Sequence, residues 1–114
     1  MIFKIVHAGE WLLVRGEYAG SPKDRADGFL HFSTAEQLMG TLARYYAGAS
    51  DLVLVAVDAE ALGPALKFEA STGGARYPHL YGPLPLTAVR WVRPIARNKD
   101  GGFLLPIDAQ DRCA

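Results

Sequence analysis

The sequence predicts a single α+β domain over residues 1–114, with a small, mostly antiparallel and split sheet and two short-to-medium helices. Its 114 residues suffice for one hydrophobic core, and 50% of them are hydrophobic. Five or six segments have the character of strands. Helical segments do not alternate regularly with them, which argues against a parallel sheet built from βαβ units.

The first 28 residues predict a strand, a short helix and a connection. Residues 2–6 are rich in β-branched and aromatic side chains and are expected to open the sheet. Residues 8–14 carry apolar side chains at the spacing of a short helix, which Gly16 would end. Glycine, proline and aspartate follow closely over residues 17–28, so we expect an irregular connection with at most one helical turn, able to approach a ligand.

A strand over residues 29–32 is expected to lead into the second helix. Two overlapping capping boxes mark the start of that helix: Ser33 with Glu36, and Thr34 with Gln37. In such a box the two side chains satisfy backbone N–H groups of the first helical turn, so the helix is expected to begin here.

The apolar face of this second helix follows from its spacing. Leu38, Leu42 and either Tyr45 or Tyr46 lie at i, i+4 and i+7, which places them on one side. Gly48 stands where a left-handed residue would end the helix.

The middle of the chain predicts two further strands. Residues 52–57 form an apolar run with β-branched side chains, typical of a strand buried on both faces at the centre of a sheet. Residues 58–62 would form a turn or a single helical turn. Residues 66–70 alternate apolar and charged side chains, which suits a strand with one wet face.

The last third of the chain predicts a structured loop, two strands and a tail. Residues 73–85 contain three glycines and three prolines around aromatic side chains, which indicates a long ordered loop. Residues 88–95 alternate as a strand, and residues 103–107 could pair with it. Residues 108–114 are expected to form a loose tail.

Composition and charge exclude several functions. Twelve Lys and Arg balance twelve Asp and Glu, so the long-range attraction of a general nucleic-acid or membrane-surface binder is missing. The single Cys113 can form neither an intrachain disulfide nor a cysteine-based metal site, which suits the reducing cytoplasm. The three histidines are too dispersed for a recognisable metal motif, so we expect no metal.

His31 and Ser33 are the first candidate site residues. Strand alternation places both on the same face. Ser33 and Thr34 stand where a strand becomes a helix, and free backbone N–H groups at such a point favour a phosphate or a carboxylate. Ser21, in the preceding connection, is a further candidate ligand contact. The alternative is structural: His31 bonded to backbone in the core, and Ser33 acting only as a cap.

A second candidate group lies in the loop over residues 73–85. His79 follows a proline that stiffens the chain, so its imidazole could serve as an acid, a base or a ligand contact, or could tie the loop to a backbone carbonyl. Arg76 offers a guanidinium beside two glycines and could take a phosphate or carboxylate. Tyr81 could stack on an aromatic ligand.

Residues 27–34 and 77–84, with the opening strand, resemble a small bacterial family catalogued as domain of unknown function 952. The similarity runs from about residue 1 to residue 96. That family is grouped with the ADP-ribosyltransferase-like fold, in which two small sheets flank a cleft that holds NAD or an ADP-ribosylated intermediate. The resemblance therefore implies a cleft, NAD as the cofactor, and His31 facing the nicotinamide or its ribose.

The chain also departs from the active relatives. Their first strand usually brings a His or Arg to the NAD ribose, and here no such group is present unless Lys4 serves. The acidic residue that orients the acceptor has no secure counterpart, with Glu69 the only glutamate near the right part of the chain.

Two hypotheses follow from the sequence. In the first, a cleft lined by His31, Ser33, Arg76, His79 and Tyr81 binds NAD, ADP-ribose or another phosphorylated small molecule and catalyses transfer or hydrolysis. In the second, the domain is a non-catalytic ligand-binding or interaction module on the same fold. An enzyme should bring His31 and His79 together with an acid nearby, whereas a structural role predicts both buried against backbone carbonyls.

Overall fold

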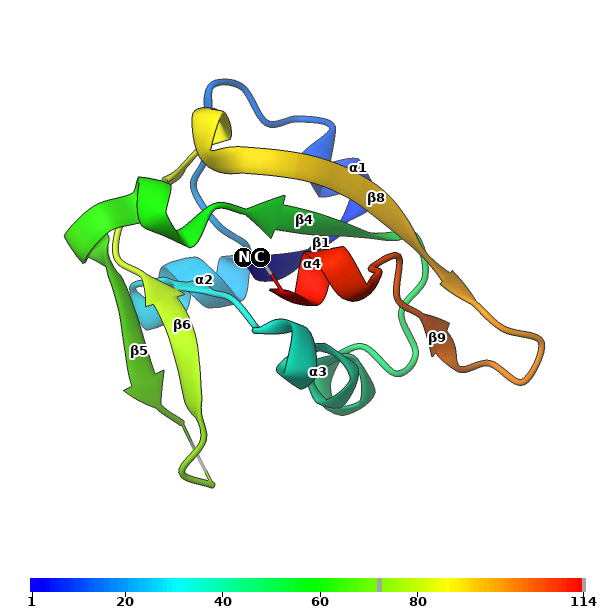
Figure 1. Ribbon diagram of the computed structural model, residues 1–114. Coiled ribbons are helices and arrows are strands. Elements are labelled where there is room, and N and C mark those ends of the chain that lie inside the picture. The colour runs from blue at the N-terminus through cyan, green and yellow to red at the C-terminus, as the bar shows by residue number, and fades with distance from the viewer. Residues whose placement is uncertain (72, 114) are drawn as a thin grey trace.

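Every strand pairing in the described part of the chain is antiparallel, and the strands form three small sheets (Figure 1). The structure is a computed structural model that describes residues 1–71 and 73–113. The sheets have the orders β1-β4-β8-β9, β2-β7 and β3-β6-β5. This is the α+β fold with a split antiparallel sheet that the sequence predicts.

The elements have the following bounds: β1 Ile2–His7, α1 Ala8–Trp11, β2 Glu17–Tyr18, α2 Pro22–Asp27, β3 Leu30–His31, η1 Ala35–Gln37, α3 Leu38–Tyr45, β4 Leu52–Val57, η2 Ala59–Ala65, β5 Leu66–Ala70, β6 Arg76–Leu80, β7 Leu84–Pro85, η3 Leu86–Ala88, β8 Val89–Arg97, β9 Phe103–Leu104 and α4 Ala109–Cys113. No helix among the described residues is long and apolar enough to cross a membrane.

Strand β4 is the centre of the main sheet, as its apolar run predicts. It pairs with β1 on one side and β8 on the other. Alternate residues of a strand point to opposite faces, so Val55 and Val57 join one hydrophobic cluster while Leu54 and Ala56 join another. All four are fully buried.

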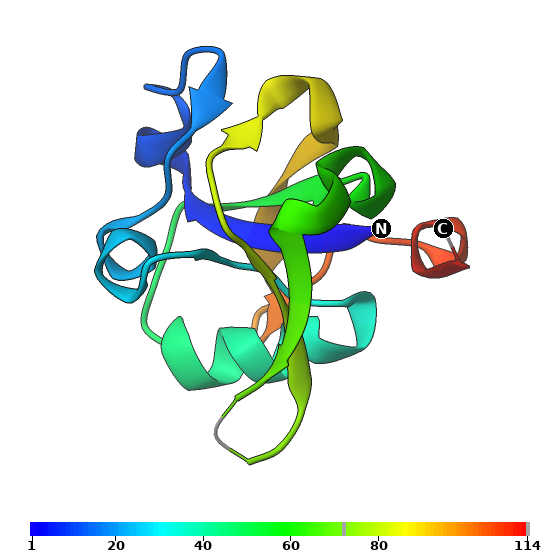
Figure 2. The same ribbon diagram turned by 90° about the vertical axis from the view of Figure 1, so that its left-hand side faces the viewer.

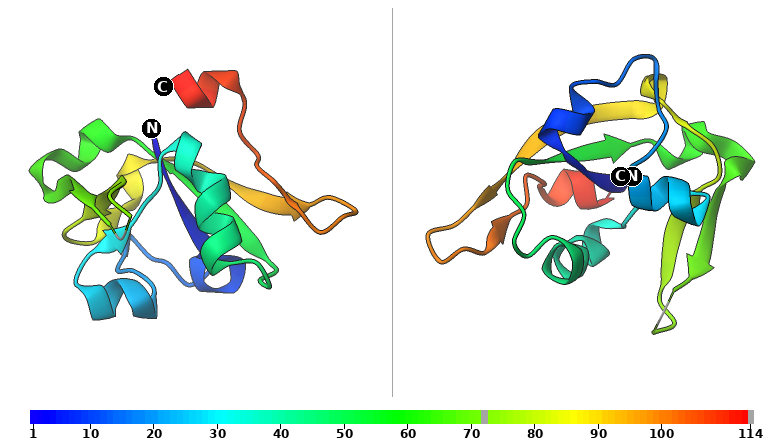
Figure 3. Two further views of the ribbon diagram at one scale, coloured as in Figure 1. Left: turned by 90° about the horizontal axis from the view of Figure 1, so that it is seen from below. Right: turned by 180° about the vertical axis from the view of Figure 1, so that it is seen from behind.

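Helix α3 covers one face of this sheet, and Figures 2 and 3 show it lying across β1 and β4. Its Leu38 and Leu42 are fully buried in the cluster that holds Phe3. The expected apolar stripe is confirmed, with Tyr46 rather than the exposed Tyr45 packed against that cluster. The prediction that a left-handed Gly48 ends this helix is wrong. The helix ends at Tyr45 with Tyr46 as its C-cap, and Gly48 does not have a positive φ.

The predicted loop over residues 73–85 is wrong, since it contains strands β6 and β7. Strand β6 lies between β3 and β5 despite its Pro78. The carbonyl of Pro78 accepts from the N–H of Phe32, so the proline nitrogen also faces β3, beyond the last paired residue, His31. Pro78 therefore removes no hydrogen bond from the pairing with β5. It lacks only the N–H that would donate back to the Phe32 carbonyl at the end of the β3 pairing.

Two further segments are more helical than expected. Residues 22–27 form helix α2, which begins at a capping box between Ser21 and Asp24. The tail expected to be loose contains α4, where the Asp111 carboxylate accepts from Trp91 Nε1 at 3.3 Å and from Arg93. Backbone hydrogen bonds from Asp108 help to hold the pKa of Asp111 below its usual range. By contrast α1 is shorter than expected and ends at Trp11.

Candidate functional site

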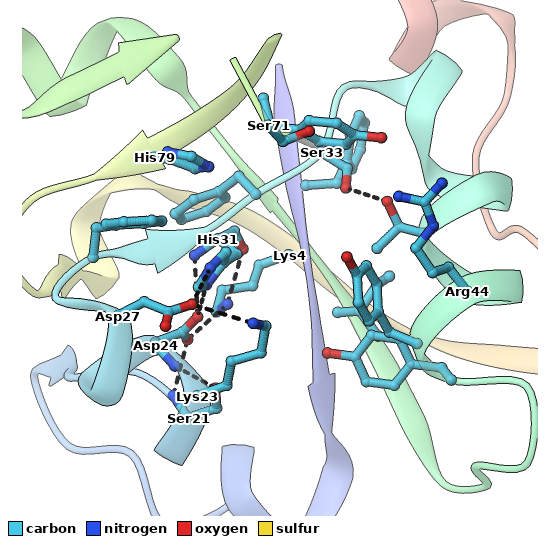
Figure 4. A pocket seen from close by; sticks show the side chains of 18 of the residues that line it. Lys4, Ser21, Lys23, Asp24, Asp27, His31, Ser33, Arg44, Ser71 and His79 are labelled. Atoms are coloured by element: carbon cyan, nitrogen blue, oxygen red, sulfur yellow. Dashed lines mark hydrogen bonds and ion pairs between the residues drawn. The ribbon is translucent and has the colours of Figure 1, made fainter. Parts of the chain in front are cut away.

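A cavity of about 430 Å³ lies between the β3–β6 pair and helix α3, with β1 as its floor and α2 at one side (Figure 4). Backbone hydrogen bonds between Phe3 and Ser33, at 2.8 and 2.9 Å, tie the chain after β3 to β1 and so fix this arrangement. The lining residues are Phe3, Lys4, Ile5, Ser21, Lys23, Asp24, Asp27, Phe29, His31, Phe32, Ser33, Gly40, Thr41, Arg44, Tyr45, Tyr46, Ala70, Ser71, Tyr77 and His79.

His31 is held between two carboxylates in the cavity wall. Its Nδ1 lies 2.6 Å from Oδ1 of Asp24, and its Nε2 lies 2.9 Å from Oδ2 of Asp27. Ionised carboxylates only accept hydrogen bonds, so both contacts are satisfied when both ring nitrogens carry hydrogen. The two carboxylates therefore fix the orientation of the His31 ring.

Asp24 and Lys4 form a buried ion pair beneath His31, with 2.8 Å between Nζ and Oδ2. Burial alone would raise the pKa of Asp24, but the hydrogen bond from His31 and the charge of Lys4 outweigh it and hold that pKa below its usual range. Burial lowers the pKa of Lys4, against the opposing effect of Asp24. The ammonium also donates to the backbone carbonyl of His31 at 2.9 Å, so Lys4 helps to fix β3.

The cap of helix α2 places Asp24 at this point. Ser21 Oγ accepts from the N–H of Asp24 at 3.2 Å, and the Asp24 carboxylate accepts from the N–H of Ser21 at 2.9 Å. Gly20 packs so closely that a Cβ there would lie 2.8 Å from Cβ of Asp24. A local capping motif therefore orients the carboxylate that positions His31.

His79 stands directly opposite His31 on the neighbouring strand β6, and their ring centroids are 5.6 Å apart. Its Nδ1 lies 2.8 Å from Oε1 of Glu69 on β5. The Tyr81 hydroxyl donates to the same oxygen at 2.7 Å. The hydrogen bonds from Tyr81 and His79 hold the pKa of Glu69 below its usual range, and the bond to Glu69 raises the pKa of Tyr81.

Phe29 joins the aromatic residues of this wall. Its ring stacks on His79, with centroids 4.1 Å apart and an interplanar angle of 24°, and tilts against His31 at 4.7 Å and Tyr81 at 5.3 Å. The cavity therefore has an aromatic wall beside His31 and its two carboxylates.

The opposite side of the cavity comes from helix α3 and carries Arg44. Its guanidinium has no carboxylate within 4.0 Å among residues 1–71 and 73–113, and it lies 6.0 Å from the ring centroid of Tyr45. Nearby, Ser33 Oγ and Thr41 Oγ1 are 3.1 Å apart. Lys23 adds a second exposed cation, 3.2 Å from Asp27, whose pKa it holds below the usual range.

The structure brings four of the predicted site residues together and leaves three outside the cavity lining. His31, His79, Ser33 and Ser21 line the cavity. Thr34 instead caps η1 in the predicted box with Gln37, whereas Ser33 contacts Thr41 and makes no cap with Glu36. Arg76 is exposed and donates to the Phe68 carbonyl at 3.4 Å. Tyr81 lies outside the lining and contacts the site through Glu69 and the ring of Phe29.

Sequence reasoning missed several members of the site. Asp24 could have been found, because Ser21 and Asp24 have the spacing of a capping box at the start of a helix. Lys23, Thr41 and Arg44 carry no local signal, since they reach the cavity only through tertiary packing. Among the described residues, no group of three or more His, Cys, Asp or Glu side chains could hold a metal ion.

Comparisons with known proteins give one family model and the solved structures of one similar protein. Residues 5–92 match the family model described as "Protein of unknown function (DUF952)". The crystal structure of protein CC0527 from Caulobacter crescentus is 45% identical, with a TM-score of 0.85 over 91% of this chain and 93% of that one. A solution NMR structure of CC0527 is 46% identical, with a TM-score of 0.79 and 89% of each chain covered.

No curated protein matches the chain. The family model covers most of the chain, from residue 5 to residue 92. The chain therefore belongs to the DUF952 family.

Proposed function

We propose that the cavity binds a small phosphorylated ligand of the nucleotide class, with NAD and ADP-ribose as the first candidates. The observation that carries this proposal is Arg44, a cation that lines the cavity with no carboxylate partner among the described residues. A guanidinium is suited to a phosphate, because its N–H groups match two phosphate oxygens at once.

The remaining surroundings of the cavity support the same ligand class. A volume of about 430 Å³ is in the range of sites for small molecules. The hydroxyl of Ser33 and the ammonium of Lys23 offer further donors to a phosphate, whereas the hydroxyl of Thr41 donates to the Gln37 carbonyl. On the opposite wall, the stacked pair of Phe29 and His79 offers aromatic surface for a base or a nicotinamide ring.

The pairing of the carboxylates around the cavity favours binding of NAD without its cleavage. A nicotinamide glycosidic bond breaks through a state with positive charge on the ribose, which a free carboxylate would stabilise. Here the three carboxylates near the two histidines all have partners. Asp24 is paired with Lys4 and His31, Asp27 with Lys23 and His31, and Glu69 with His79 and Tyr81.

The second candidate function is an ADP-ribosyltransferase-like enzyme, and one observation favours it. His31 and His79 share a cavity wall and are held by carboxylates rather than by backbone carbonyls. An enzyme is expected to bring the two histidines together with an acid nearby, as they are here.

Thermal-shift and calorimetric titrations with NAD, ADP-ribose, AMP and phosphate-free adenosine test the proposal. We expect stabilisation by the phosphorylated compounds and little by adenosine. Arg44→Ala should weaken binding about tenfold or more, as loss of a charge-assisted contact does. Arg76→Ala is the matched control, because Arg76 lies outside the cavity lining.

Each candidate predicts a separate result. If no phosphorylated compound binds, or if Arg44→Ala binds as wild type does, the proposed site is wrong. Release of nicotinamide from NAD, followed by chromatography, would favour the transferase over binding alone.

A further inference from the structure

The two histidines of the cavity wall differ in their hydrogen bonding. His31 has a carboxylate at each ring nitrogen, whereas His79 has one carboxylate, at Nδ1. We infer that they form an acid–base pair that hydrolyses a cyclic phosphodiester of a single nucleoside. This inference rests on the proposed binding of a phosphorylated ligand, and it adds a reaction and a substrate class.

His79 has the arrangement of a general base. Because the ionised Glu69 can only accept, it fixes the hydrogen of His79 on Nδ1 and leaves the lone pair on Nε2. Nε2 has no hydrogen-bond partner among the described residues, and it is not one of the buried polar atoms that would need one. The side chain of His79 lines the cavity, so Nε2 is available to a ligand or a water molecule there. Tyr81, which donates to the same Glu69 oxygen, holds that carboxylate in place.

His31 has the arrangement of a general acid. Both its nitrogens face carboxylates, which only accept hydrogen bonds, so in the inferred pair Nε2 is the donor to the leaving oxygen. The partner of Nδ1, Asp24, is buried and fixed by Lys4 and the cap of α2. The partner of Nε2, Asp27, is more exposed and also bound to Lys23, so a leaving oxygen can replace it at Nε2.

The volume of the cavity and the net charge of the chain favour a small diester as the substrate. A cavity of about 430 Å³ has room for a mononucleotide, and the zero net charge of the chain provides no general attraction for a polymer. A diester confined to one nucleotide is a cyclic one. Arg44 and Lys23 would neutralise the charge on its phosphate oxygens.

The reaction balances with water as the other reactant. Nε2 of His79 takes a proton from water as the water oxygen forms a bond to phosphorus. The bond between phosphorus and one ribose oxygen breaks, and that oxygen takes the proton from Nε2 of His31. The product is a nucleoside monophosphate, and solvent returns the proton from His79 to His31.

The test uses the purified chain and adenosine 2′,3′-cyclic monophosphate, with the product separated by chromatography. We expect wild type to hydrolyse it and His79→Asn to lose at least 100-fold in kcat, as removal of a general base does. Glu69→Gln should lower kcat about tenfold or more with KM unchanged, because Glu69 acts through His79 as a positioning residue. Glu60→Gln, an exposed carboxylate outside the cavity lining, is the matched control and should match wild type.

The outcomes separate this inference from the binding proposal. Binding of the cyclic nucleotide without hydrolysis would overturn the acid–base pair and leave the proposed function standing. Failure of the cyclic nucleotide, AMP and ADP-ribose all to bind would overturn both. Hydrolysis at the wild-type rate by folded His79→Asn or Glu69→Gln would mean that the pair does not carry the reaction.

Discussion

His31 and His79 lie directly opposite each other in the β3–β6 pair, with ring centroids 5.6 Å apart, and His31 contacts two carboxylates whereas His79 contacts one. Two short strands thus present two imidazoles with different hydrogen-bond partners to one cavity. The buried Lys4 and Asp24 support the first, and the half-buried Glu69 and the exposed Tyr81 support the second.

Asp24→Asn should destabilise the fold more than Lys4→Met does. Without the carboxylate charge, the ammonium of Lys4 stays buried without its counter-ion, which costs about 3–5 kcal/mol in such pairs. In Lys4→Met the carboxylate keeps His31 and the N–H of Ser21 as donors, so we expect roughly 1–3 kcal/mol. Urea unfolding followed by circular dichroism gives both values. Equal losses, or a larger loss for Lys4→Met, would contradict the importance assigned to Asp24.

Asp24 should also make stability depend on acidity. Its folded pKa lies below the ordinary value of 3.8, so the folded state binds fewer protons at this group than the unfolded state does. The stabilisation is fully present above that ordinary value and is lost as pH falls through the folded pKa. The difference in unfolding free energy between wild type and Asp24→Asn should therefore shrink between pH 5 and pH 2. A constant difference across that range would count against this linkage.

Gly20→Ala should disturb the site more than Gly28→Ala. Both glycines have positive φ, +105° and +86°, so alanine is strained at either position. A Cβ at Gly20 would also lie 2.8 Å from Cβ of Asp24, whereas at Gly28 it meets nothing within 4 Å. We expect about 1 kcal/mol for Gly28→Ala and clearly more for Gly20→Ala. Thermal unfolding measures both, and a larger loss at Gly28 would refute the close packing around Asp24.

Leu42→Ala should destabilise the chain by about 2–5 kcal/mol, because Leu42 is fully buried between α3 and the main sheet. Leu12 is 74% exposed, so Leu12→Ala should stay within about 0.5 kcal/mol of wild type. Chemical denaturation of the two variants gives the comparison. A small effect at Leu42 would mean that α3 does not hold the cavity wall through its core face.

Local patterns predicted much of the fold. The apolar run of β4 and the alternation of β5 gave strands with the observed bounds, because the period of a strand is visible within a few residues. Strand alternation likewise placed His31 and Ser33 on one face, and both line the cavity. The many glycines and prolines around β6 and α2 indicated loops. Strand β6 forms through its pairing with β5, and α2 begins at a capping box, and composition shows neither.

The rest of the site depends on contacts between distant parts of the chain. His31 and His79 are paired because β3 lies beside β6. These two strands are separated in the chain by helix α3 and by strands β4 and β5. Arg44 reaches the cavity because α3 packs across β1, and Arg76 is left out because β6 turns it to solvent. No local pattern distinguishes these two arginines.

A titration of ¹⁵N-labelled protein with ADP-ribose, followed by amide chemical shifts, tests the central claim that this cavity is the binding site. We expect saturable changes in amide chemical shift at cavity residues of β3, β6 and α3, including His31, Thr41, Arg44 and His79. The amides of Leu12 and Arg90, which lie outside the cavity lining, should not change. Saturable shifts confined to another surface, or no shifts for ADP-ribose, NAD and AMP alike, would contradict it.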